Sequence, residues 1–336
     1  MKKNFSRRDF ILKSAIGGMG LGLVWHSTPL LSNIPGTKSG KRSMEETEPI
    51  IDIHQHLAYS GRTDDQLLTH QRAMGISTTI LLPSGRRVNY GSTYYGLSNG
   101  LQAQTTGNEA CYAFAQKYPR EFLAGANEVP DHPEALSEIE KYLKLGAPVI
   151  GEQKFGVECD APEMQKVYEL AEKYNVPVLM HWQYGMYNRG LDRFHRMLEK
   201  FPRVNFIGHA QTWWANIDKD HRDQNVLYPK TKVTPGGVTD RLLSDYPNMY
   251  GDISAGSGLN SLLRDEDHTR KFMDRHQDKL LFGSDCSDLV GHGKGCLGAQ
   301  LIEAVRRLSP DKRAERKILY GNAKRLFRLE RLKDQK

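Results

Sequence analysis

The stretch "IIDIHQHL", residues 50–57, ends an apolar run with two histidines one residue apart, His54 and His56. Alternate side chains of a β-strand lie on the same face. We therefore expect Asp52, His54 and His56 to point one way, and the two intervening isoleucines to point the other way, towards surrounding helices. Two imidazoles at this spacing can bind one metal ion. The pair alone is more often incidental, so the rest of the chain has to decide.

Short apolar runs alternate with helical patterns from residue 50 onward. The strand-like runs are 50–54, 77–83, 122–128, 148–155, 176–181, 204–209, 248–254 and 279–285. The helix-like runs are 64–74, 107–118, 133–145, 162–174, 190–200, 236–245, 259–276 and 297–308, followed by an amphipathic helix over 311–328. This alternation is typical of parallel βαβ units.

Eight such units in about 280 residues predict an α/β fold, a (β/α)₈ TIM barrel with a C-terminal extra helix. A doubly wound sheet is the alternative, but it usually has a glycine-rich phosphate loop after its first strand. Here the first strand ends in His-Gln-His instead. The long loops 83–106 and 210–235 follow strands 2 and 6, and both leave the face on which barrels build their sites.

Polar side chains end three more of the predicted strands. "VPVLMH" ends at His181, "VNFIGH" at His209 and "KLLFGSD" at Asp285. The carboxyl ends of barrel strands converge on one rim, and a polar group in so apolar a strand is costly unless it is paired or bound. Each residue alone could be a satisfied core histidine or a helix cap. Together they predict a metal site.

This motif set resembles the amidohydrolase superfamily, and is most similar to its amidohydrolase-related branch, which includes aminocarboxymuconate-semialdehyde decarboxylase. The stretches that carry the resemblance are "IIDIHQHL", "VPVLMHW", "FIGHA", "LLFGSDC" and the tail "ERKILYGNAKRLFRL" (315–329). It covers residues 48 to 330, and it is specific for the superfamily but weak for the reaction.

The resemblance implies His54, His56, His181 and Asp285 as ligands of a divalent ion, with zinc as the expected metal. It makes Asp285 and His209 the catalytic candidates. Asp285 would act as general acid–base, whereas His209 would be either a ligand of a second ion or a catalytic base and electrophile.

The number of ions depends on the fourth strand, "VIGEQKF", in which Glu152 and Lys154 have the same parity and should both face inward. In binuclear members of the superfamily this strand supplies a bridging ligand, and Gly151-Glu152 is similar to the Gly-Glu of TatD-type deoxyribonucleases. Glu152 is therefore a candidate metal ligand. The alternative is that Glu152 pairs with Lys154 beside a single ion.

Residues near the rim are candidates for contact with a small-molecule substrate. Aromatic faces suit planar or sugar-like molecules, and an arginine can hold a carboxylate or phosphate. The candidates are Trp182, Trp213, Trp214, Lys154, Arg86 and Asp252. Rim packing and surface charge are the alternatives for the tryptophans and Arg86, and Asp252 could instead orient a ligand. His292 and Asp288 could reach the site from the loop after the last strand. The remaining histidines are expected to be solvated: His70, His132, His195, His221, His268 and His276.

Residues 1–45 are expected to form a twin-arginine export signal and linker, followed by the barrel domain, 46–336. "SRRDFILK" (6–13) has the twin-arginine pattern, and a short apolar run follows it. Residues 1–42 carry a net charge of +7, which equals that of the whole chain, so the remainder is neutral and a nucleic-acid-binding face is not supported. We expect the twin-arginine translocase as a partner and a periplasmic or membrane-anchored protein. Whether the chain forms a homo-oligomer stays open.

Three functions compete for this sequence. The first is a metal-dependent hydrolase that cleaves an amide, lactone or ester with metal-activated water. The second is a lyase, a decarboxylase or hydratase on the same scaffold, which an inward arginine near the ion would favour. The third is a non-catalytic periplasmic barrel that only binds ligand, against which the His/His/His/Asp set argues. The four cysteines, Cys111, Cys159, Cys286 and Cys296, have no C-x-x-C spacing and are expected to be buried thiols. The pair Cys286/Cys296 could oxidise after export.

Overall fold

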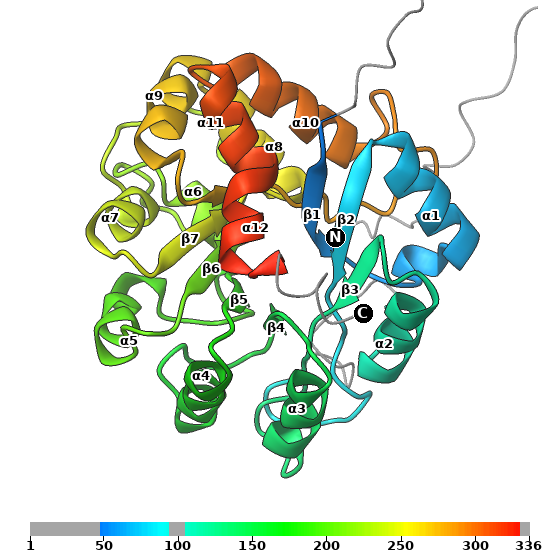
Figure 1. The fold of residues 1–336 in the computed structure, drawn as a ribbon. Coiled ribbons are helices and arrows are strands. Elements are labelled where there is room, and N and C mark those ends of the chain that lie inside the picture. Colours follow the sequence, from blue (N-terminus) through cyan, green and yellow to red (C-terminus); the bar gives the residue numbers. More distant parts are fainter. Residues whose placement is uncertain (1–47, 94–104, 330–336) are drawn as a thin grey trace, which may run out of the picture. The chain divides into compact units, whose positions relative to one another are not determined.

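The computed structural model describes residues 48–93 and 105–329, so the predicted export signal lies outside the described residues. Parallel strands alternate with helices along the chain (Figure 1). The strands are β1 (Ile50–Gln55), β2 (Ile76–Leu81), β3 (Phe122–Ala124), β4 (Ile150–Gln153), β5 (Val178–His181), β6 (Phe206–His209), β7 (Met249–Asp252) and β8 (Leu280–Leu281). All eight lie within or beside the predicted runs.

The helices include those predicted and add short ones. Between the strands lie η1 (Tyr59–Gly61), α1 (Asp64–Ala73), α2 (Asn108–Lys117), α3 (Ala135–Lys144), α4 (Pro162–Tyr174), η3 (Leu191–Arg193), α5 (His195–Lys200), α6 (Gln211–Ala215), α7 (Val238–Asp245), α8 (Ala255–Leu263) and α9 (Glu266–His276). After β8 come α10 (Leu297–Leu308), α11 (Lys312–Arg316), the π-helical turn η4 (Lys317–Gly321) and α12 (Asn322–Leu326).

The strands form two parallel sheets, β1-β2-β3 and β4-β5-β6-β7-β8. Individual hydrogen bonds join these sheets at both edges. The Ile53 amide donates to the Phe282 carbonyl (3.1 Å), and the Gly151 amide donates to the Ala126 carbonyl (2.9 Å). The strands therefore follow one another in the order of a TIM barrel, as predicted, although the ladder is interrupted at two places.

Two apolar layers hold the barrel together. The inner layer fills the barrel with side chains from opposite strands, and α12 covers the end of the barrel that faces the viewer in Figure 1. Its members are Ile51, Ile53, Ile80, Leu82, Val149, Leu179, Ile207, Leu281, Ala323, Leu326, Phe327 and Leu329. The predicted C-terminal helix is thus present, and the Phe282 amide donates to the carbonyl of Ile318 in its π-helical turn (3.1 Å). The outer layer packs the strands against the helical ring.

The face that Ile51 and Ile53 occupy corrects the first expectation. Both side chains point into the barrel rather than towards the helical ring. Asp52 points outward instead, where it accepts a hydrogen bond from Gln71 of α1 (2.9 Å). Between Asp52 and Gln55, β1 advances three residues while β2 advances two, which is the signature of a β-bulge. The bulge changes the parity, so His54 and His56 point inward although Asp52 does not.

Strand β4 has the same irregularity. Ile150 pairs with Val178 and Gln153 pairs with Met180, so three residues again oppose two. The shift turns the side chain of Glu152 inward, onto the face that Val149 occupies lower in the barrel. Simple alternation from Val149 would place Glu152 on the outer face. Both β1, which supplies the two inward histidines, and β4, which supplies Glu152, therefore contain a bulge where they enter the site.

Two predicted helices, 190–200 and 259–276, are each divided in the structure, the first into η3 and α5. The run 259–276 is not one helix, because Asp265 interrupts it with a non-helical backbone (φ −151°) and caps α9 by accepting from the His268 amide. The segment 210–235, expected as a loop, begins with α6.

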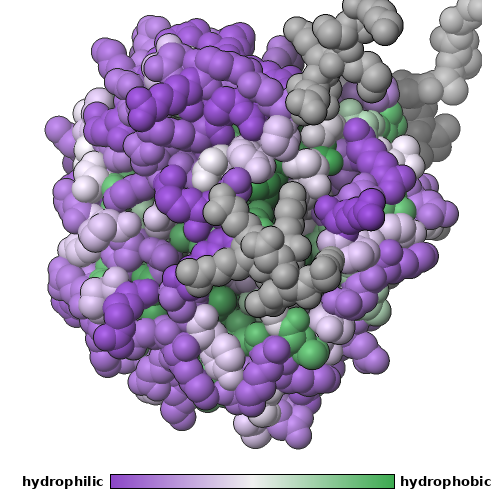
Figure 2. Space-filling view, in the orientation of Figure 1, coloured by the Kyte–Doolittle hydropathy of each residue, from purple (hydrophilic) through white to green (hydrophobic). Residues whose placement is uncertain are grey.

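The face of the molecule in Figure 2 is mostly hydrophilic over its helices. Within the described ranges, no helix combines the length and apolarity needed to cross a bilayer.

Candidate metal centre

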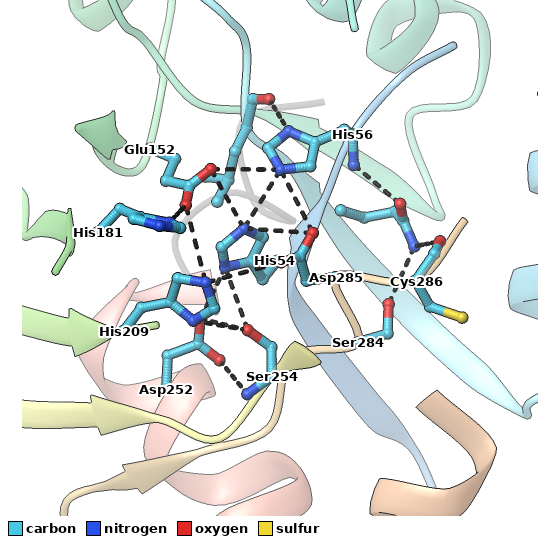
Figure 3. A network of polar contacts seen from close by, with 12 residues as sticks. His54, His56, Glu152, His181, His209, Asp252, Ser254, Ser284, Asp285 and Cys286 are labelled. Atoms are coloured by element: carbon cyan, nitrogen blue, oxygen red, sulfur yellow. Dashed lines mark hydrogen bonds and ion pairs between the residues drawn. The ribbon is translucent and has the colours of Figure 1, made fainter. Parts of the chain in front are cut away.

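The strand ends bring six side chains to one centre in the upper barrel, as Figure 3 shows. On one side, the Nε2 atoms of His54 and His56 lie 3.3 Å apart. Glu152 Oε2 lies 3.5 Å from His56 Nε2 and 3.7 Å from His54 Nε2. Asp285 Oδ1 lies 3.6 Å and 3.9 Å from the same two atoms. These four side chains surround a single point.

The other oxygen of Glu152 faces a second pair of histidines. Glu152 Oε1 lies 2.5 Å from His181 Nδ1 and 3.7 Å from His209 Nε2. Asp285 also reaches this side, since its Oδ2 lies 3.6 Å from His209 Nε2. Strands β5 and β6 place the two rings side by side, because His181 pairs directly with His209 in the ladder. Glu152 therefore lies between two groups of nitrogen ligands, in the position of a bridge.

Hydrogen bonds outside the centre orient the rings. His54 Nδ1 donates to Asp252 Oδ2 (2.7 Å), and His56 Nδ1 donates to the Leu82 carbonyl (2.8 Å). His209 Nδ1 lies 3.0 Å from Ser254 Oγ and 3.3 Å from Asp252 Oδ2. Since these Nδ1 atoms carry the protons, each Nε2 presents a lone pair to the centre.

His181 is turned the other way round. Its Nε2 faces the amide oxygen of Gln183 (3.4 Å), so its Nδ1 is the atom that meets Glu152. Apart from the short hydrogen bond between His181 Nδ1 and Glu152 Oε1, the centre is lined by imidazole lone pairs and carboxylate oxygens, which are acceptors. Acceptors at these separations repel one another unless a proton or a cation lies between them.

Except for the 2.5 Å hydrogen bond between Glu152 and His181, the separations of 3.3 to 3.9 Å match those expected around a metal ion. Nitrogen and oxygen ligands about 2.1 Å from a tetrahedral ion lie about 3.4 Å from one another. His209 Nε2 and Asp285 Oδ1 are buried and have no hydrogen-bond partner in the described part of the chain. Three overlapping groups of side chains could each hold an ion: His54–His56–Glu152, His54–His209–Asp285 and Glu152–His181–His209. The residues therefore fit a metal centre.

The charges of the buried groups support this arrangement. Burial lowers the pKa of His181 to about 4, and the nearby Lys154 ammonium acts in the same direction, so the ring is neutral at pH 7. Burial would raise the pKa of Asp285, but the cationic form of His54 and the nearby His209 ring hold it far below its ordinary value. His181 is therefore available as a neutral ligand and Asp285 as an anionic one.

The pKa of His54 indicates how the charges of the centre are balanced when no metal ion is bound. Burial lowers the pKa of an imidazole, yet Asp285 and Asp252 raise that of His54 well above its ordinary value. In the apo-protein a proton can therefore take the place of a metal ion between these acceptors. Ion binding must release that proton, which makes metal affinity dependent on pH.

Two functional candidates were missed in the sequence. Ser254, two residues after Asp252, donates to Asp252 Oδ2 (2.8 Å) and contacts the rings of His54 and His209. Tyr59, three residues after His56, packs its ring edge-on against His56, and the charge of Asp285 beside its hydroxyl raises its pKa. Both follow a strand end at short distance, and that position was their only signal.

The tryptophans do not line the centre. Trp182 and Trp213 are fully buried and Trp214 is 2% exposed, and all three belong to the outer apolar layer. The Trp213 ring fills the space beside Gly208, and Trp214 Nε1 donates to the Asp252 carbonyl (2.9 Å). The expected substrate contact is therefore replaced by packing between the barrel and its helices.

The three polar candidates have different surroundings. Arg86 forms ion pairs with Glu128 and Glu134 (2.8 and 2.7 Å), so its guanidinium is not offered to a substrate carboxylate. Asp252 is fully buried behind the histidines and orients ligands rather than meeting substrate. Lys154 is partly exposed and lies over the Tyr187 ring (5.5 Å), and its positive charge helps to lower the pKa of Glu152. Of these three, Lys154 alone suits substrate contact.

The loop after β8 and the outlying histidines also depart from expectation. His292 is exposed, and Asp288 caps a turn by accepting from the amides of Val290 and Gly291. His70, His268 and His276 are buried instead of solvated. All four cysteines are buried and free, as expected.

The family model described as "Amidohydrolase" matches residues 51–329, which is most of the chain. The chain belongs to the amidohydrolase family. The matched range contains every residue of the centre, and the resemblance derived from the strand-end motifs is confirmed. No curated protein matches the chain.

Solved structures share the fold at low sequence identity. An uncharacterized TIM-barrel protein from Bordetella bronchiseptica has a TM-score of 0.56 at 18% identity, over 85% of this chain and 99% of its own. A protein assigned as a 2-pyrone-4,6-dicarboxylic acid hydrolase from Pseudomonas putida has a TM-score of 0.55 at 14% identity (84% and 98%). A dihydroxybenzoic acid decarboxylase from Polaromonas, solved with bound manganese, has 0.54 at 15% (84% and 98%). The neighbours include a hydrolase and a decarboxylase, so the shared fold does not decide the reaction.

Proposed function

We propose that this amidohydrolase-family enzyme hydrolyses an amide, lactone or ester bond with water activated at the metal centre. The observation that supports this most strongly is the placement of Asp285. Its two oxygens face both halves of the centre, 3.6 Å from His56 on one side and 3.6 Å from His209 on the other. A carboxylate in this position can take a proton from water and return it to a leaving group.

A divalent ion held here, with zinc as the first candidate, would lower the pKa of water towards ~7 and so supply a nucleophile at neutral pH. Asp285 accepts the proton of that water. The low pKa of its carboxyl keeps it anionic at neutral pH and ready for this role. After the carbonyl carbon has been attacked, the same carboxyl group hands the proton to the departing nitrogen or oxygen.

We further propose two ions rather than one. His54, His56 and Asp285 would hold the first, His181 and His209 the second, and Glu152 would bridge them. Support comes from the two oxygens of Glu152, which face different histidine pairs. In this proposal His209 is a ligand, so replacing it with alanine removes one of two bound ions. Loss of turnover with both ions retained would instead make His209 a catalytic base.

Two side chains at the opening are candidates for substrate contact. The Lys154 ammonium can hold the carbonyl oxygen or a carboxylate of the substrate, because no carboxylate in the described ranges pairs with it at ion-pair distance. The Tyr59 hydroxyl lies beside Asp285 and can donate to the same substrate oxygen once it turns from the carboxylate. Both predict a substrate with an electron-rich oxygen next to the scissile bond.

Arginine contacts argue against the lyase alternative. The Arg62 guanidinium donates to Gln55 and to the Cys286 carbonyl, and Arg86 is paired with two glutamates. Neither is directed at a substrate carboxylate beside the ion. Neither Arg62 nor Arg86 is therefore the inward arginine that would favour a decarboxylase.

A screen of metal-loaded protein with lactones, N-acyl compounds and hydroxylated aromatic acids tests the reaction. In water labelled with ¹⁸O, we expect one labelled oxygen in the carboxylic acid product and no release of carbon dioxide. Carbon dioxide release from an aromatic acid, without incorporation of label, would replace the hydrolase proposal with the lyase.

We also infer export by the twin-arginine route, which rests on "SRRDFILK" (6–13) and the apolar run after it. A periplasmic or membrane-anchored enzyme would act on molecules outside the cytoplasm. The translocase is then a partner during export only.

A further inference from the structure

A second cluster of metal-binding side chains lies beside the proposed catalytic centre and shares no residue with it. His70 of α1 and the two cysteines of the loop after β8, Cys286 and Cys296, are each at most 1% exposed. Their ligand atoms all lie within 4.8 Å of one another. Met74, at the end of α1, adds a thioether sulfur 3.6 Å from Cys296 Sγ.

The spacing within this cluster is that of zinc ligands. The Cys286 and Cys296 sulfurs are 3.8 Å apart, and Cys296 Sγ lies 3.4 Å from His70 Nε2. Around a tetrahedral zinc ion with Zn–S about 2.3 Å and Zn–N about 2.1 Å, two sulfurs lie about 3.8 Å apart, and a sulfur and a nitrogen about 3.6 Å. The observed separations agree with both values.

The surrounding fold holds the donors in place. Gly291 has a left-handed backbone (φ +81°), and a Cβ there would lie 2.3 Å from the His70 carbonyl oxygen. A Cβ on Gly298 would lie 2.5 Å from Met74 Sδ. These two glycines let the loop and α10 approach α1 closely. Arg62 fixes the loop on its other side by donating to the Cys286 carbonyl (2.9 Å).

We propose that His70, Cys286 and Cys296 form a separate zinc site, with the Met74 thioether as its fourth neighbour. Thiolate and imidazole ligands suit this ion. Two thiolates and a divalent ion give a neutral buried group, whereas a monovalent ion would leave a net negative charge in the interior, which is costly. Each thiol releases its proton on binding. The ion would tie the loop that follows Asp285 to α1.

An ion could reach the cluster from the surface past Met74. A cavity of about 450 Å³ lies on the far side of Met74 from the cluster, and Met74, Gly291 and His292 belong to its wall. Rotation of the flexible Met74 side chain would open the cluster to this cavity.

Cobalt spectroscopy tests this site separately from the catalytic centre. Full-length protein is stripped of metal under reducing conditions and titrated with Co²⁺. Only a site with sulfur ligands gives the intense thiolate-to-cobalt charge-transfer band in the near ultraviolet, because the catalytic centre contains nitrogen and oxygen ligands alone. We expect a saturable band that Zn²⁺ abolishes. Absence of the band while all four thiols are reduced would overturn the proposal.

Two variants locate the band. Cys296→Ser should lose it entirely, whereas Cys111→Ser, which alters a buried thiol elsewhere, should keep it. Persistence of the band in Cys296→Ser would overturn the assignment. If that variant does not fold, X-ray absorption of the zinc-loaded wild type decides, since sulfur neighbours at about 2.3 Å are expected and nitrogen and oxygen alone would contradict them. A Cys286–Cys296 disulfide that persists in the metal-treated protein also contradicts the proposal.

Discussion

At the scale of single residues, the centre depends on which ring nitrogen of each histidine faces inward. Asp252 lies against the Nδ1 atoms of both His54 (2.7 Å) and His209 (3.3 Å), and Ser254 contacts both rings as well as Asp252. The ligand histidines could be predicted from the sequence because each ends an apolar strand. The roles of Asp252 and Ser254 could not be settled there, because they depend on contacts with strands 43 to 200 residues away in sequence.

Removing the orienting carboxylate should weaken metal binding without removing any ligand. We expect Asp252→Asn to lower metal affinity about 10–100-fold, the usual effect of losing a group that orients ligating histidines. Metal titration followed by mass spectrometry of the bound ions measures this. Asp240→Asn is the matched control, since Asp240 is also a buried partner of a histidine, His276 (2.7 Å), but lies away from the centre. Equal affinity loss in both variants would show a general effect on stability.

The proton shuttle gives a kinetic prediction. Asp285→Asn should lower kcat about 10²–10⁴-fold, because an amide cannot accept and return the proton. The assay is run at saturating metal, and circular dichroism checks the fold. Asp274→Asn, on the exposed side of α9, is the control and should keep full activity. Unchanged turnover in Asp285→Asn would exclude this residue as the general acid–base.

At the scale of elements, two β-bulges determine which residues enter the centre. Strand alternation predicted the inward direction of His54 and His56 for the wrong reason, since Asp52 and the isoleucines occupy the opposite faces. The extra residue in β1 and in β4 cannot be read from apolar spacing, because it depends on how each strand pairs with its neighbour. The tryptophans were misjudged for a related reason. Residues next to a ligand in sequence point to the outer layer when the ligand points inward.

Packing of Trp213 against β6 can be tested directly. A Cβ on Gly208 would lie 2.5 Å from the Trp213 ring, which is buried and cannot move away. We expect Gly208→Ala to lower the free energy of unfolding by about 1–3 kcal/mol, the usual cost of overpacking. Urea denaturation measures this change. Gly256→Ala in α8 is the control, because its nearest neighbour is 3.9 Å away. No loss of stability in Gly208→Ala would mean that the tryptophan is mobile.

Contact between α7 and α9 gives a pH-dependent prediction. Burial would raise the pKa of Asp240, but hydrogen bonds from His276 and the Gly236 amide, with the charge of Arg275, lower it below its unfolded value. The folded state then binds fewer protons than the unfolded state, so this stabilisation is complete above pH ~4 and is lost as pH falls below it. Asp240→Asn should cost about 1–3 kcal/mol at pH 7. By urea denaturation, the difference from wild type should shrink at pH 3, and an undiminished difference would contradict this account.

At the scale of the whole molecule, the fold was largely predictable from the sequence. The burial and contacts of residues outside the metal centre were not. Alternating strands and helices sufficed for the barrel and its C-terminal helix, because both are patterns of local periodicity. The split between α8 and α9 and the short α6 were missed, since single residues such as Asp265 decide them. His70 was taken as solvated because it lies among polar residues in α1, yet the loop after β8 buries it completely.

The export proposal is also a property of the whole chain. Replacing Arg7 and Arg8 with lysine keeps the charge but removes the arginine pair. We expect the enzyme to remain in the cytoplasm, as judged by cell fractionation. Replacing Lys38 and Lys41 with arginine, which also keeps the charge, is the control and should leave export intact. Export of the twin-lysine variant at the normal level would exclude this route.

Diffraction from metal-loaded crystals at the absorption edge of the bound ion tests the central claim most directly. We predict anomalous peaks among the six side chains of the centre, one beside His54, His56 and Asp285 and one beside His181 and His209, with Glu152 between them. A single peak would retain the metal centre and reject the bridge. The account would be contradicted if the fully loaded protein gave no peak among these six residues.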